Sequence, residues 1–87
     1  MPKFIIERTV GKLTEDQVAE ALRRAQAVAD ELPQVKWIRT YYADAEGKMY
    51  CEYEAPHIDL IYEHARRAKV PADVVRMVTE LEPAMFR

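Results

Sequence analysis

Hydrophobic and polar positions alternate along two segments of the chain, residues 35–43 and 48–55, and apolar residues recur at helical spacing along two others. The two alternating segments and two further segments, residues 2–9 and 74–81, are rich in aromatic and β-branched residues and predict strands. Apolar residues three or four positions apart predict two helices. One runs from Thr14 to Pro33 and the other from about His57 to Lys69.

The first helix has the clearest start signal in the chain. Thr14 followed by Gln17 is the pattern of a capping box, in which each residue's side chain accepts a hydrogen bond from the other's backbone N–H. Leu13 and Val18 occupy the positions of a hydrophobic staple across this cap. We therefore expect the helix to begin at Thr14 and to end before Pro33.

The two middle strands read as a hairpin joined by residues 44–47, and its register can be argued. If Ala43 lies opposite Lys48, an opposite-charge pair (Arg39 with Glu52) and an aromatic pair (Tyr41 with Tyr50) form. Each such pair contributes a few tenths of a kcal/mol up to about 1 kcal/mol. The other face then carries Ile38, Thr40 and Tyr42 beside Tyr53, Cys51 and Met49.

The order strand, helix, strand, strand, helix, strand predicts an α+β ferredoxin-like fold, with one antiparallel sheet and both helices on one face. Right-handed crossovers place the strands at 2–9 and 48–55 in the centre. We expect residues 1–87 to form a single domain, since a chain of 87 residues has room for one core.

Two helices cover one side of a sheet, so the other side should be open. By alternation this side carries Trp37, Arg39, Tyr41, Tyr50, Glu52 and Glu54. An aromatic patch of this size on a small domain is typical of a binding site or an oligomer interface. We predict a two-fold homodimer in which the two open faces stack; the alternative is a monomer with an exposed aromatic face.

Composition, charge and missing motifs argue against several classes of function. The formal net charge is −2 with both signs interspersed, so nucleic acid is a poor candidate partner. No apolar run is long enough to span a membrane. A single cysteine cannot form an intramolecular disulfide, and we expect a cytoplasmic protein. Motifs of nucleotide binding, dithiol redox chemistry and serine or zinc hydrolysis are missing from the sequence.

His64 is the most informative single position because it lies on the apolar side of the second predicted helix. It should point at the sheet near Cys51 or Tyr53. It is then either a core histidine bonded to a neighbouring thiol or phenol, or a metal ligand or acid/base group in a cleft. Cys51 is either a small buried hydrophobic residue, or a nucleophile or second metal ligand.

Carboxylates could also converge, because Glu7, Glu52 and Glu54 lie on neighbouring central strands. The alternative is that they form ion pairs with arginines, namely Arg8, Arg39 and Arg76.

Two stretches resemble a known family: Tyr50-Cys51-Glu52-Tyr53-Glu54-Ala55-Pro56, and Glu63-His64-Ala65-Arg66-Arg67-Ala68 with Val70-Pro71-Ala72-Asp73 after it. The opening Pro2-Lys3-Phe4-Ile5-Ile6-Glu7-Arg8 fits as well. The family comprises small bacterial proteins, among them a nickel-responsive, nickel-binding protein. This resemblance implies a ferredoxin-like fold, homodimerisation as an α/β barrel, and binding of Ni²⁺. The positions that match the family motif are Cys51, Tyr53 and His64.

Two positions depart from the family pattern. Lys69 stands where the family tends to have the glycine that ends the second helix, and His57 stands where a small polar N-cap is usual.

Three functions follow as hypotheses. The first is a non-enzymatic dimer that binds a small ligand or metal ion, with nickel as the first candidate and Cys51 and His64 as ligands. The second is an enzyme of the dimeric α/β-barrel type, with His64 as acid/base and Tyr41 or Tyr53 as hydrogen-bond donor. The third is a structural or interaction module that assembles through Trp37.

Overall fold

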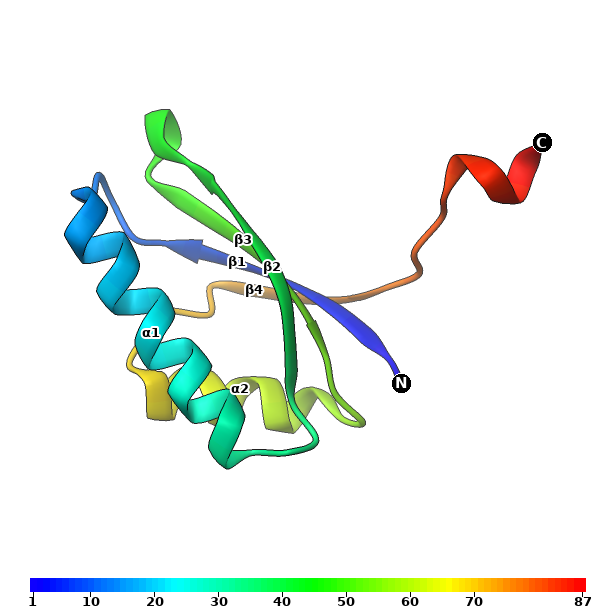
Figure 1. The fold of residues 1–87 in the computed structure, drawn as a ribbon, viewed down its shortest axis with the longest axis horizontal. Coiled ribbons are helices and arrows are strands. Elements are labelled where there is room, and N and C mark those ends of the chain that lie inside the picture. The colour runs from blue at the N-terminus through cyan, green and yellow to red at the C-terminus, as the bar shows by residue number, and fades with distance from the viewer.

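The computed structural model describes all 87 residues and has the predicted ferredoxin-like βαββαβ order (Figure 1). The elements are β1 (Lys3–Thr9), α1 (Glu15–Glu31), β2 (Lys36–Ala43), β3 (Lys48–Glu54), α2 (Ile58–Ala68) and β4 (Val74–Val78), with short 3-10 turns η1 (Asp44–Glu46) and η2 (Pro83–Phe86). The strands form one antiparallel sheet in the order β2-β3-β1-β4, which places β1 and β3 in the centre as predicted. No helix has the length and apolarity that a membrane crossing requires.

Both helices lie on one side of the sheet, and the core fills the space between them and the strands (Figure 1). Alternation along the central strands sends every second side chain into this space. The buried cluster draws mainly on β1 and β3 and consists of Phe4, Ile6, Val35, Met49, Cys51, Tyr53, Ala55 and Ile61. The opposite side of the sheet has no helix over it, and we call this surface the open face.

The predicted cap of α1 is confirmed. Thr14 Oγ1 accepts a hydrogen bond from the Gln17 backbone N–H at 3.2 Å, and Gln17 Oε1 accepts one from the Thr14 N–H at 2.9 Å. The end of α2 shows how the departure from glycine is accommodated. Lys69 takes the left-handed conformation itself, with φ 57° and ψ 45°. A side chain at such a position carries a conformational cost that glycine would not.

The predicted hairpin register holds from Arg39 to Ala43 and fails before it. Arg39 pairs with Glu52 and Tyr41 with Tyr50, but Trp37, not Ile38, lies opposite Tyr53. A β-bulge between Trp37 and Arg39 is the reason. An extra residue reverses the alternation of everything before it, and so exchanges the two faces.

The prediction that Trp37 belongs to the open face is therefore wrong. Its indole packs against the core cluster, and its Nε1–H donates to Thr40 Oγ1 at 2.9 Å. Trp37 lies on the helix-covered side of the sheet.

The last strand is shorter than predicted. It ends at Val78, where the expectation extended to residue 81. Val78 pairs with Lys3, the first residue of β1, so the chain beyond it has no neighbouring strand with which to form a ladder. Residues 79–87 leave the sheet instead (Figure 1).

Candidate functional site

His64 points into the core, as predicted, and is 1% exposed. Its ring meets the Tyr53 ring edge-on, with centroids 4.9 Å apart. Its hydrogen-bond partner is neither thiol nor phenol but the Ala25 carbonyl of α1, 2.8 Å from Nε2. Because a carbonyl only accepts, Nε2 must carry the proton. Burial lowers the pKa of His64; the Ala25 hydrogen bond opposes this shift and the charge of Arg8 adds to it.

Cys51 is buried on β3, and its sulfur is already engaged on two sides. Sγ accepts hydrogen bonds from Arg8 Nε at 3.4 Å and from Thr40 Oγ1 at 3.1 Å. The Thr40 hydroxyl in turn accepts from the indole of Trp37. The thiol therefore ends a short hydrogen-bonded chain that begins at the bulge in β2.

Arg8 lies in the core of the domain and not in an ion pair with a carboxylate. It was expected as an ion-pair partner of a carboxylate, yet it is 2% exposed and none of the ion pairs includes it. Its Nη1 donates to the Pro71 carbonyl at 2.5 Å, and its Nη2 is buried without a partner. The alternation of Phe4, Ile6 and Arg8 was the signal that could have placed it in the core.

The Arg8 guanidinium also lies beside Tyr53. Its Cζ is 5.9 Å from the Tyr53 ring centroid, within the range of a cation–π contact. Burial raises the pKa of Tyr53 to about 12, and the nearby charge of Arg8 works in the opposite direction. The centre of the domain thus combines a guanidinium, a thiol, a phenol and an imidazole between the sheet and the helices.

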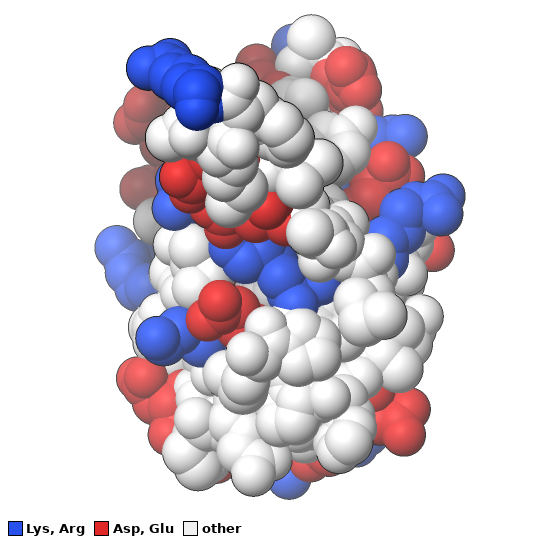
Figure 2. Space-filling view, turned by 90° about the vertical axis from the view of Figure 1, so that its right-hand side faces the viewer, with Lys and Arg blue, Asp and Glu red and all other residues white.

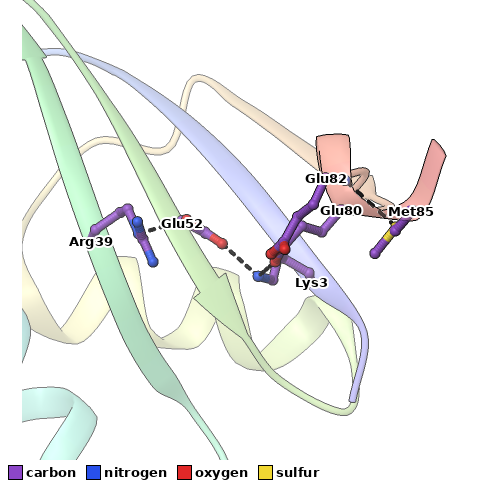
Figure 3. Close-up of polar contacts among 6 residues, drawn as sticks. All are labelled: Lys3, Arg39, Glu52, Glu80, Glu82 and Met85. Carbon is purple, nitrogen blue, oxygen red and sulfur yellow. Dashed lines mark hydrogen bonds and ion pairs between the residues drawn. The ribbon is translucent and has the colours of Figure 1, made fainter. Parts of the chain in front are cut away.

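The open face is organised around a chain of alternating charges (Figure 3). Glu52 accepts from Arg39 at 3.1 Å and from Lys3 at 2.5 Å, and Lys3 also contacts Glu80. The hydrogen bond from Lys3 to Glu52, followed by that to Glu80, raises the pKa of Lys3. Contact between the two carboxyls lowers the pKa of Glu80 and raises that of Glu82.

Of the two alternatives for the strand carboxylates, convergence or ion pairing, the structure shows ion pairing for Glu52 and Glu7. Glu52 binds the two cations named above, and Glu7 pairs with Lys48 at 3.6 Å. Charged side chains of both signs meet across the middle of this side of the molecule, with an uncharged area below them (Figure 2). Tyr41 and Tyr50 pair on the same face, and Tyr41 is 64% exposed.

Comparison with known proteins places this arrangement in a family. Residues 4–78 match the sequence profile of a family described as nickel responsive protein SCO4226-like. The chain belongs to this family. Among solved structures, it is similar to SCO4226 from Streptomyces coelicolor A3(2), with a TM-score of 0.82 and 25% sequence identity over 92% of this chain and 99% of that one. No curated protein matches the sequence. Residues 79–87 lie beyond the family match.

The surroundings of Cys51 and His64, the metal ligands expected from the sequence, do not fit a metal ion. No group of three or more His, Cys, Asp or Glu side chains could hold a metal ion. His64 Nε2 is committed to Ala25, and the Cys51 sulfur lies 3.4 Å from a guanidinium nitrogen. A divalent cation at that sulfur would be repelled by the positive charge of Arg8.

Access to the core residues is also closed. Five hollows of the surface are lined by other residues, and none of them includes Cys51, Tyr53 or His64. An acid/base must reach within hydrogen-bond distance of its substrate. The packed surroundings of His64 therefore favour a structural role and count against the enzymatic alternative.

One further imidazole lies at the surface. His57 is exposed at the N-cap of α2, and its side chain makes no capping hydrogen bond. It lines a hollow of about 390 Å³ together with Asp59 and the thioether of Met77. This hollow, and not the core, is where an imidazole and a carboxylate are both available to a ligand from outside.

Proposed function

We propose that this protein is a cytoplasmic, non-catalytic homodimer that binds a small ligand, and that Ni²⁺ is the ligand to test first. Membership of the SCO4226-like family is the observation that carries the choice of nickel. Because the Cys51 sulfur and His64 Nε2 already form hydrogen bonds within the core, we place the proposed site elsewhere.

The nickel site that we propose is the hollow around His57. Imidazole nitrogen and carboxylate oxygen are both accepted nickel ligands, and His57 and Asp59 line the same hollow. Water completes the coordination of an ion held by few protein ligands, so the proposed site is of modest affinity and exposed to solvent. Neither ligand has to break a core hydrogen bond to bind the ion.

Calorimetric titration of the metal-free protein with NiCl₂ tests this site directly. We expect binding heat in the wild type and in His64→Gln, and at least a tenfold loss of affinity in His57→Ala. If a folded His64→Gln protein no longer bound nickel, the site would lie in the core at His64 and the proposal of a site at His57 would be wrong. An absence of heat in the wild type would remove nickel from the proposal and leave the dimer to be judged separately.

The homodimer that we propose stacks two open faces across a two-fold axis. Support comes from the lack of a helix over this face, from the exposed Tyr41 and its neighbour Tyr50, and from charge pairs that satisfy one another within the face. A surface with paired charges can be covered by a second copy without leaving an isolated buried charge. Aromatic side chains in such a position are typical of interface anchors.

Sedimentation velocity at micromolar concentration tests the dimer. We expect twice the monomer mass of 10.1 kDa for the wild type. Tyr41→Glu, which places a charge at the proposed contact, should give the monomer mass. The matched control is Tyr62→Glu, since Tyr62 is 46% exposed but lies on α2, over the other side of the sheet. A 10.1 kDa wild type, or equal loss of the dimer in both variants, would contradict the proposal.

A further inference from the structure

The segment after β4 projects from the domain as an arm. Residues 79–87, which we call the C-terminal arm, run away from the body of the domain on the side opposite the helices (Figure 1). They are held at their base by the contact of Glu80 with Lys3, a residue of the open face (Figure 3). The arm ends in the short turn η2, and Figure 2 views the molecule from the side on which it projects.

The arm carries large apolar side chains that nothing in its own chain covers. Leu81 is 68% exposed, Met85 60% and Phe86 75%. A segment of this length does not hold a helical turn by itself, since nucleation costs more than one turn returns. Large apolar side chains that are exposed together on one segment are typical of a surface that contacts a partner. The arm also lies outside the part of the chain that matches the family.

We propose that this arm packs against a second copy of the chain, at the start of β2 around Trp37. The inference rests on the proposed homodimer and adds to it a named contact. The arm rises from the open face, which is the surface that the dimer brings against its twin. In a face-to-face pair each arm therefore extends alongside the other protomer.

The strand register identifies the receiving surface. Val78 at the end of β4 pairs with Lys3, Lys3 pairs with Glu54, and Glu54 pairs with Lys36 at the start of β2. The end of β4 and the start of β2 thus lie at the same end of the sheet, on opposite edges. A two-fold axis parallel to the strands lays the end of β4 in one copy over the start of β2 in the other.

The receiving hollow lies at the edge strand β2 on the helix-covered side of the sheet, beside the C-terminal half of α1. The partner's arm therefore has to pass around the edge formed by β2, and its nine residues span about 30 Å when extended, which is enough. This hollow of about 300 Å³ is lined by Ala29, Pro33, Val35 and Trp37 together with the polar side chains of Gln26, Asp30 and Lys36. Trp37 is only half-buried in the isolated chain, so its indole has area left to cover. Docking of Phe86 or Leu81 at this hollow would bury apolar surface on both protomers.

The experiment uses the full-length chain and exploits its single tryptophan. The variant Leu81→Ser/Phe86→Ser removes the apolar groups of the arm, and Ile58→Ser/Tyr62→Ser removes two exposed apolar groups of α2 as a control. Dimer dissociation constants come from sedimentation over a dilution series, and the environment of Trp37 comes from its fluorescence emission. Circular dichroism verifies that each variant is folded.

We expect the arm variant to dissociate at least tenfold more readily than the wild type, with Trp37 emission shifted to longer wavelength at concentrations where the wild type is dimeric. The control should match the wild type in both measurements. A wild-type dimer whose dissociation constant and emission do not change in the arm variant would overturn the arm contact alone. A monomeric wild type would overturn the homodimer and the arm contact together.

Discussion

Replacement of Arg8 by methionine should stabilise the domain, although it removes the most buried charge in the molecule. The favourable contacts of the guanidinium are few: a hydrogen bond to the Pro71 carbonyl, a longer one to the sulfur of Cys51, and the cation–π contact with Tyr53. A hydrogen bond from a charged donor contributes about 1.5–3 kcal/mol, and the cation–π contact about 0.5–2 kcal/mol. Pro71 is exposed, so water can replace the lost donor.

The energetic costs of burying the Arg8 guanidinium are larger than these favourable contributions. Burial of a charge without a counter-ion costs several kcal/mol, and the unpaired Nη2 adds about 1–3 kcal/mol. Methionine fills a similar length with an adaptable apolar side chain. We therefore expect Arg8→Met to raise the free energy of unfolding by about 1–2 kcal/mol on the balance of these terms.

Urea unfolding at one protein concentration measures this difference, because the stability of a dimer depends on concentration. Arg8→Ala is the matched control. It removes the same charge but leaves a cavity, so it should be about 2–5 kcal/mol less stable than Arg8→Met. An Arg8→Met protein less stable than the wild type by more than about 1 kcal/mol would refute the reasoning, because the guanidinium would then be a net source of stability.

Two further predictions concern α2. The native pKa of His64 is lowered, so the unfolded chain binds a proton at this residue before the folded chain does as the pH falls. The free energy of unfolding should therefore decline below pH about 6.5. Its slope is at most about 1.4 kcal/mol per pH unit, and the decline ends once the pH is below the native pKa. His64→Gln, which can still donate to Ala25, should lose this dependence in urea unfolding between pH 7 and 5 while His57→Ala keeps it; equal slopes in all three proteins would contradict it. Lys69→Gly should raise stability by about 0.5–1 kcal/mol because glycine adopts the left-handed conformation freely. Arg67→Gly, in the last turn of the same helix, should lower stability by about 1 kcal/mol.

Local rules explain most of what the sequence predicted correctly about the fold. The cap of α1 depends on residues three positions apart, and the register from Arg39 to Ala43 depends on pairs that meet directly across the hairpin. Such contacts are short-range, so a pattern of residue types is enough to find them. The orientation of His64 followed in the same way from the apolar side of one helix.

The failures share a different physical origin. A bulge is one extra residue in an alternating pattern, and the aromatic run from Trp37 onward reads equally well with or without it. The early end of β4 depends on where β1 begins, which is a property of a partner strand far away in sequence. The partner of His64 is a main-chain carbonyl, and every residue type supplies one.

The buried charge of Arg8 affects where this protein can bind a metal ion. A buried guanidinium that contacts the sulfur of Cys51 makes the surrounding core positive, and a positive core is a poor place for a divalent cation. This is why the nickel site that we propose lies at the surface of the chain and not in its core. The exposed imidazole of His57 and the uncovered open face both lie outside this positive core. If Arg8→Met leaves nickel binding unchanged while His57→Ala abolishes it, the core and the binding surface serve separate purposes.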